Sequence, residues 1–129
     1  MHEELKSYLR DQPVLALVGA SRRPEKYGNI ILRNMLSKGF TVIPINSAES
    51  EIEGQQSYPN LKAAQSAREI GLVVYVVPPP RTLNSLKEAQ ELGLKKVWVQ
   101  PGAGDERTLA YLKENDFEFL QDACVMVET

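Results

Sequence analysis

Short apolar runs alternate with helical patterns along this chain, and this alternation restricts the available folds more than any other feature. The apolar runs with strand character cover residues 14–18, 41–45, 72–77, 97–99 and 117–119. Between them apolar residues recur at helical spacing, as Ile31, Leu32 and Met35 do. Regular alternation of strand and helix predicts a parallel sheet with helices on both faces. Near-continuous apolar strands agree with this, because parallel strands are buried on both sides.

We expect one α/β domain over residues 1–129, with a leading helix within residues 1–12. Its predicted architecture is a three-layer, Rossmann-like, doubly wound parallel sheet of five strands in the order 3-2-1-4-5. Pro44 conflicts with a regular strand at 41–45, since proline normally avoids central strands. We therefore expect this strand to be short or bulged.

Single residues mark where several helices begin and end. Gly39 and Gly93 follow helical patterns, where a left-handed cap is expected. Asn60 precedes a short helical pattern that runs through Ala67, and an Asn in this place is a common N-terminal cap.

Charge and side-chain chemistry exclude several classes of function. With 15 basic and 17 acidic residues the formal charge is −2, so no large positive field is available for nucleic acid. No apolar run approaches the roughly 20 residues of a membrane span, and the expected partners include neither nucleic acid nor membrane. The lone Cys124 cannot form an intrachain disulfide, which favours the cytoplasm. The lone His2 lies beside the start, so we predict no catalytic histidine and no metal site.

A phosphate site is predicted in the loop that follows the first strand. Ligands of such sheets bind outside the carboxyl ends of the strands, and Gly19 follows the first strand directly. The loop from Gly19 to Gly28 then carries Arg22, Arg23 and Lys26 before the start of a helix. The N–H groups and the dipole at a helix start bind phosphate.

The loop does not match the two best-known nucleotide fingerprints. The dinucleotide fingerprint requires G-x-G-x-x-G and an acidic residue about 20 positions later. Here Gly19 is followed by Ala20 and Ser21, the next glycine is Gly28, and the second strand ends in Asn46. The Walker A pattern is absent as well, so the sequence disfavours both NAD binding and hydrolysis of nucleoside triphosphates.

Several short segments, in order along the chain, carry a resemblance to a known family. They are Val18-Gly19-Ala20-Ser21, Lys26-Tyr27-Gly28, Val42-Ile43-Pro44-Ile45-Asn46, Tyr58-Pro59-Asn60-Leu61, Val77-Pro78-Pro79, Val99-Gln100-Pro101-Gly102 and Asp122-Ala123-Cys124. Over almost the whole chain the sequence resembles the coenzyme A-binding domain family, Rossmann-like proteins similar to the N-terminal domain of the succinyl-CoA synthetase α-subunit.

The resemblance implies a site for coenzyme A (CoA) or an acyl-CoA. The residues that it assigns to the ligand, together with the basic Arg22 of the loop, are Gly19, Ala20, Ser21, Arg22, Lys26, Asn46, Pro78, Pro79, Gln100, Pro101 and Gly102. The glycine loop would cradle the pyrophosphate, with Lys26 as its charge partner. Asn46 would lie along the adenosine, the two prolines would form the pocket wall, and the segment that begins at Gln100 would flank the pantetheine arm.

These expectations favour a non-catalytic protein that binds CoA or an acyl-CoA. Two alternatives remain: an NAD(P)-dependent Rossmann oxidoreductase, and an accessory subunit of an acyl-CoA ligase. A second copy of the chain or an acyl-CoA enzyme is the expected protein partner. We expect Cys124 to be a buried core residue, with a mixed disulfide to the coenzyme thiol as the alternative, and Tyr27 to stack on adenine.

Overall fold

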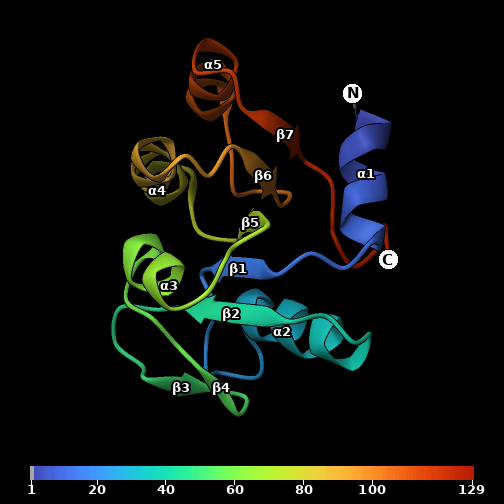
Figure 1. Ribbon diagram of the computed structural model, residues 1–129, viewed down its shortest axis with the longest axis vertical. Helices are drawn as coiled ribbons and strands as arrows, with labels where there is room; N and C mark the ends of the chain where they lie inside the picture. Colours follow the sequence, from blue (N-terminus) through green and yellow to red (C-terminus); the bar gives the residue numbers. More distant parts are fainter. Residues whose placement is uncertain (1) are drawn as a thin grey trace.

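The computed structural model describes residues 2–129 as five helices packed on the two faces of a parallel sheet, with a separate small hairpin (Figure 1). Met1 and the side chain of His2 lie outside the described part, so the expectation about His2 stays a prediction. The elements are α1 His2–Arg10, β1 Leu15–Val18, α2 Tyr27–Ser37, β2 Val42–Ile45, β3 Glu51–Ile52, β4 Gln55–Gln56, α3 Leu61–Ala67, β5 Leu72–Tyr75, α4 Pro79–Leu92, β6 Lys96–Val99, α5 Glu106–Glu114 and β7 Glu118–Gln121. The predicted α/β class, the five parallel strands and the leading helix are confirmed.

The order of the strands differs from the prediction. The five-stranded sheet runs β2-β1-β5-β6-β7, which is 2-1-3-4-5 when its strands are counted along the chain, so the predicted 3-2-1-4-5 is wrong. After β2 the chain crosses back over β1 and adds β5 on the other side. The apolar pattern of a strand records its burial but not the side of β1 on which the next strand is added, so the sequence pattern leaves this choice open.

The crossover over β1 divides the helices between the two faces of the sheet. Helices α3, α4 and α5 lie along one face and α1 along the other (Figure 1). Alternate strand residues face the two cores: Ala16 and Val18 pack with the first group of helices, while Leu15 and Leu17 pack with α1 and α2. Each strand of the sheet interior is therefore buried on both sides, as its near-continuous apolar sequence predicts.

Pro44 lies within β2, and β2 is an edge strand. The strand covers four residues, Val42–Ile45, with a continuous register against β1, so of the two expected alternatives it is short rather than bulged. The carbonyl groups of Thr41 and Ile45 accept from β1, whereas Pro44 O faces away from β1 and accepts from Tyr58 N at 3.1 Å. The missing N–H of Pro44 therefore points away from β1, and its absence costs no hydrogen bond of the ladder.

The polar stretch at 46–57 contains a small antiparallel hairpin, β3–β4, that the sequence did not predict. Its two loop residues, Glu53 and Gly54, have φ angles of 50° and 76°. Two successive positive φ angles are typical of the tight type I′ turn. The signal for this hairpin in the sequence is weak, because each strand has two residues and a Glu replaces the usual Asn or Asp of this turn.

No helix within residues 2–129 has the length and apolar character that would let it cross a membrane.

Candidate functional site

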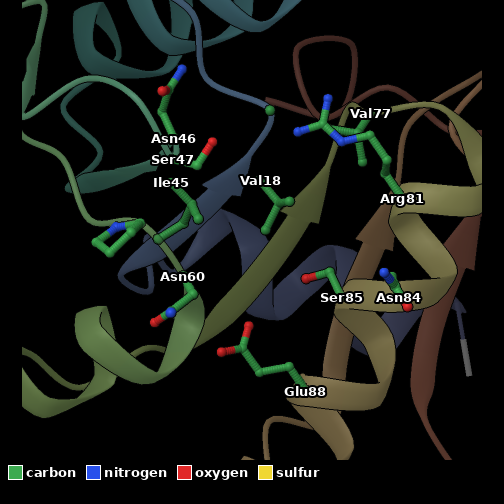
Figure 2. Close-up of a pocket in the computed structure, with 12 residues that line it drawn as sticks. Val18, Ile45, Asn46, Ser47, Asn60, Val77, Arg81, Asn84, Ser85 and Glu88 are labelled. Atoms are coloured by element: carbon green, nitrogen blue, oxygen red, sulfur yellow. The ribbon is translucent and has the colours of Figure 1, made fainter.

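A cavity with two lobes opens at the carboxyl ends of β1, β2 and β5. We call the whole the strand-end cavity. Its helix lobe, about 270 Å³, lies between α3 and α4 (Figure 2) and is lined by Val18, Gly19, Ile45, Asn46, Ser47, Pro59, Asn60, Val77, Arg81, Asn84, Ser85 and Glu88. Its loop lobe, about 400 Å³, is lined by Gly19, Ala20, Ser21, Lys26, Tyr27, Gly28, Ile45, Asn46, Ser47, Val76, Val77, Pro78 and Arg81. In the order 2-1-3-4-5 the strand connections reverse direction between β1 and β5, which is where ligands of such sheets bind.

Two glycines allow the first loop to pass close to its neighbours. Gly19 has a φ of 109°, and a Cβ atom there would lie 2.7 Å from Cγ1 of Val76. A Cβ atom on Gly28, in the first turn of α2, would lie 2.0 Å from Gly19 O. Gly28 therefore performs the close helix–strand packing that the third glycine of the dinucleotide fingerprint provides, although it lies nine residues after Gly19.

Polar side chains behind the loop fix its shape. Asn46 Nδ2 donates to Ala20 O at 2.9 Å, and Asn29 Nδ2 donates to Ser21 O at 2.8 Å. Asn29 is fully buried, and its Oδ1 accepts from Arg33 Nε at 2.6 Å. The amide of Asn46 thus holds the loop in addition to lining both lobes. Arg33, which lies two helical turns after Lys26, stabilises the loop through this hydrogen bond to Asn29.

The N-terminus of α2 is open toward the loop lobe. Its N-cap residue Lys26 makes no side-chain cap, and its first turn has no acidic residue. By contrast Asn60 caps α3 and Asp105 caps α5. The first turn of α2 thus carries no carboxylate of its own, and the nearby Glu53 accepts from Asn29 Nδ2 at 3.0 Å rather than from the backbone of the helix start. An uncapped helix start of this kind is the arrangement that binds phosphate.

The positive charge of the loop is concentrated on fewer side chains than the sequence suggests. Arg22 pairs with Glu49 at 3.2 Å, and Arg23 pairs with Glu25 at 2.7 Å. Among residues 2–129, no carboxylate forms an ion pair with Lys26 or Arg81, the two cations that line the cavity. These two side chains are the ones available to an anionic ligand.

Neutral polar groups and one carboxylate line the helix lobe. Glu88 accepts from the backbone N–H groups of Leu61 and Lys62, both at 3.2 Å, so it covers the start of α3. Ser85 Oγ donates to Tyr75 OH at 3.3 Å. Figure 2 shows Asn46 and Ser47 across the lobe from Arg81, with Glu88 at the far end from the guanidinium. This lobe suits a neutral group with hydrogen-bonding edges better than a phosphate.

Six of the eleven residues predicted for the ligand lie around the loop lobe. They are Gly19, Ala20, Ser21, Lys26, Asn46 and Pro78. The other five do not line either lobe: Arg22 pairs with Glu49, Pro79 begins α4, and the segment Gln100-Pro101-Gly102 follows β6. Because β5 lies between β1 and β6 in the sheet, the residues after β6 are one strand farther from the first loop than the predicted order implied.

Four cavity residues on α4 were missed by the sequence reasoning. Arg81, Asn84, Ser85 and Glu88 follow the spacing i, i+3, i+4, i+7, which places them on one face of the helix. The three prolines at 78–80 obscure the stripe in the sequence, because a run of prolines is typical of a loop rather than of a helix interior. In the structure Pro79 and Pro80 are the first two residues of α4, a place where proline is common.

A model of the CoA binding domain matches residues 14–129 of the chain. The chain belongs to this family. A solved structure of a conserved hypothetical protein from Pyrococcus furiosus is 45% identical, with a TM-score of 0.86 over 91% of this chain and 99% of that one. The uncharacterized protein YneT of Bacillus subtilis is 28% identical over 128 residues, 96% of this chain and 90% of YneT.

A longer protein contains a related segment. The alpha subunit of ADP-forming acetate–CoA ligase II from Pyrococcus furiosus is 33% identical over 86 residues. That match covers 66% of this CoA-binding domain and 18% of the ligase subunit, so the chain spans less than a fifth of this relative. Helix α1 precedes the segment that the family model matches.

The cysteine of this CoA-binding domain lies beside the loop lobe. Cys124 is half-buried, 3.2 Å from the hydroxyl of Tyr27 and 3.3 Å from Gln100 Nε2. Burial raises the pKa of the Cys124 thiol, but hydrogen bonds from Tyr27, Gln100 and the backbone of Met126 and Val127 outweigh it and leave the pKa below its usual value. Gln100 is fully buried and also accepts from Val125 N at 2.9 Å, so it fixes the C-terminal segment to the end of β6.

Proposed function

We propose that the protein binds CoA or an acyl-CoA in the strand-end cavity, as a binding protein rather than as an enzyme. The observation that carries this is the open N-terminus of α2, which meets Lys26 and the loop at Gly19 at the carboxyl end of β1. Backbone N–H groups and an available lysine are the groups that hold a pyrophosphate. The family membership supports CoA as the source of that pyrophosphate.

The residues that line the two lobes support an assignment of the parts of the ligand. The pyrophosphate would lie in the loop lobe, and the adenosine would lie in the helix lobe among Asn60, Asn84 and Ser85. The pantetheine arm would leave past Tyr27, whose side chain is 39% exposed and borders the loop lobe. Because Tyr27 lies on the loop side, it would contact this arm rather than stack on the adenine.

The arrangement is less suited to NAD(P). Dinucleotide-binding sheets hold the ribose 2′-hydroxyl with an acidic residue at the end of the second strand. Here that place belongs to Asn46, and its side-chain oxygen already accepts from the backbone N–H groups of Ala48 and Glu49 at 2.8 and 3.0 Å. An NAD-dependent oxidoreductase therefore lacks support from this strand end.

A second candidate is an accessory subunit of an acyl-CoA ligase, in which a partner chain supplies the chemistry. The related segment in an acetate–CoA ligase alpha subunit favours it. That function requires the same CoA site and adds a protein partner. In either case the free cysteine is consistent with a cytoplasmic location.

Calorimetric titration with CoA, acetyl-CoA, NAD, NADP and ATP tests the proposal. We expect CoA or acetyl-CoA to bind in the micromolar range and the other ligands to bind more weakly. Lys26→Glu should weaken CoA binding at least about tenfold, since the new carboxylate repels phosphate. The matched control is Lys87→Glu, an exposed lysine of α4 that does not line the cavity. Tight binding of NAD with no heat from CoA would overturn the proposal.

A further inference from the structure

Arg81 lies where the two lobes of the strand-end cavity meet. Six residues line both lobes: Gly19, Ile45, Asn46, Ser47, Val77 and Arg81. Arg81 is the one charged residue in this set. Its side chain is exposed, and no carboxylate of residues 2–129 forms an ion pair with it. A guanidinium is thus available at the junction.

The acidic end of the cavity is too far away to neutralise this guanidinium. Glu88 lies seven residues after Arg81 on α4, which is about 10 Å along a helix axis. Figure 2 shows the guanidinium extending from α4 toward the ends of the strands, away from Glu88. The Glu88 carboxylate accepts hydrogen bonds from the first backbone N–H groups of α3, those of Leu61 and Lys62.

The backbone at the start of α4 cannot hold an anion by itself. Pro78, Pro79 and Pro80 have no N–H group. The next two N–H groups, of Arg81 and Thr82, both donate to Pro78 O, at 2.9 and 3.1 Å. From the start of α4, any donor to an anion must therefore come from the Arg81 side chain, and a guanidinium offers two parallel donors that match a phosphate.

We propose that Arg81 binds the 3′-phosphate of CoA and so selects CoA over nucleotides that lack this group. The inference rests on the proposed function and on the covalent structure of CoA, whose ribose carries the adenine, the pyrophosphate chain and the 3′-phosphate. With the adenine in the helix lobe and the pyrophosphate in the loop lobe, the ribose lies at the junction of the lobes. Its 3′-phosphate then lies beside the one charged residue of that junction.

This assignment divides the two available cations between the two phosphate groups of the ligand. Lys26 and the start of α2 bind the pyrophosphate, which ADP, NAD and dephospho-CoA also contain. Arg81 binds the phosphomonoester, which they lack. A pair of hydrogen bonds between charged groups corresponds to about 10- to 100-fold in affinity, and this is the preference for CoA over dephospho-CoA that we expect from the wild-type protein.

The test is a titration of the wild-type protein, Arg81→Gln, Lys26→Gln and Arg107→Gln with CoA and with dephospho-CoA. Arg107 is the matched control, because it is an exposed arginine of α5 that does not line the cavity. We expect Arg81→Gln to lose most of the affinity for CoA and to bind dephospho-CoA as the wild type does. We expect Lys26→Gln to weaken both ligands by the same factor and Arg107→Gln to change neither.

The other outcomes overturn the proposal in distinguishable ways. If Arg81→Gln weakens both ligands equally, Arg81 contacts the pyrophosphate and the assignment is wrong. If Arg81→Gln changes neither, the 3′-phosphate lies elsewhere while CoA binding itself stands. If the wild-type protein binds neither ligand, the proposed function fails together with this inference. Thermal unfolding of each variant shows that the fold is retained.

Discussion

Replacement of Gly28 by alanine tests whether the close approach of α2 to the first loop is needed for stability and for binding. The added Cβ would lie 2.0 Å from Gly19 O and 2.9 Å from Gly19 C, whereas real Cβ atoms stay at least 3.0 Å from such atoms. The loop and the start of α2 must therefore separate by about 1.0 Å. Both atoms that crowd the Cβ belong to the backbone, so no side-chain rotation relieves the contact.

We expect Gly28→Ala to lower both the free energy of unfolding and the affinity for CoA. Overpacking of this kind costs about 1–3 kcal/mol, and for a domain of this size about 2 kcal/mol corresponds to roughly 8 °C in melting temperature. The same shift moves the N–H groups of α2 away from the loop lobe. We expect CoA affinity to fall at least about tenfold, which is equivalent to roughly 1.4 kcal/mol.

Thermal unfolding and calorimetric titration with CoA measure the two effects, and Gly93→Ala is the matched control. Gly93 has a φ of 74° with nothing within 4 Å of an added Cβ, and it ends α4 shortly before β6 begins, near the amino ends of the strands and away from the cavity. Its replacement should cost about 1 kcal/mol through backbone strain alone and leave CoA affinity unchanged. If Gly28→Ala unfolds at the wild-type temperature and binds CoA with wild-type affinity, the close approach is not needed and the reasoning is refuted.

Three further predictions concern single contacts. Glu88→Gln should lower the free energy of unfolding in urea by about 1 kcal/mol, because the charge at the start of α3 is lost; an equal effect of Glu91→Gln, an exposed neighbour, would argue against this. Tyr27→Phe should raise the pH midpoint of Cys124 alkylation by iodoacetamide, since the hydroxyl that lowers the pKa of the thiol is removed, and an unchanged midpoint would contradict that role. Burial raises the pKa of Tyr75 well above its usual range. The contribution of the protonated Tyr75 to the free energy of unfolding is therefore fully present below the unfolded-state pKa of about 10, and it is lost as the pH rises above that value. Tyr75→Phe should lose less stability between pH 9 and pH 11 than the wild-type protein. An equal change of the urea midpoint in both proteins between the two pH values would refute this.

The strands and the first loop could be predicted because their signals are local. An apolar run predicts a buried strand, and Gly19 follows the first strand in either topology. The first loop also borders the reversal of strand connections in both the predicted and the observed order, since strand 1 flanks the reversal in each. The prediction of a ligand loop at Gly19 therefore did not depend on the strand order. Gln100 follows β6, one strand farther away, and contacts only the end of this loop, where its Nε2 donates to the Tyr27 hydroxyl at 3.5 Å.

The identity of the available cations could not be predicted from the sequence. Arg22 and Arg23 resemble phosphate ligands by their position in the loop, but each has a carboxylate partner. The partner of Arg22 is Glu49, 27 residues away in the polar stretch that leads to the small hairpin, and no local pattern connects the two. Arg81 follows a run of prolines and carries no motif, so its position in the cavity depends on the crossover that brings α4 beside β1.

The outward face of Pro44 has a consequence for how the protein can associate. Unpaired N–H and C=O groups along an edge strand can template pairing with another chain. On β2 the proline removes one outward donor, and Tyr58 already pairs with the neighbouring groups through its N–H to Pro44 O and its C=O to Asn46 N. An incoming strand would therefore find the outward groups at the carboxyl end of β2 already paired within the chain. The end of β2 that borders the strand-end cavity is thus closed to intermolecular strand pairing.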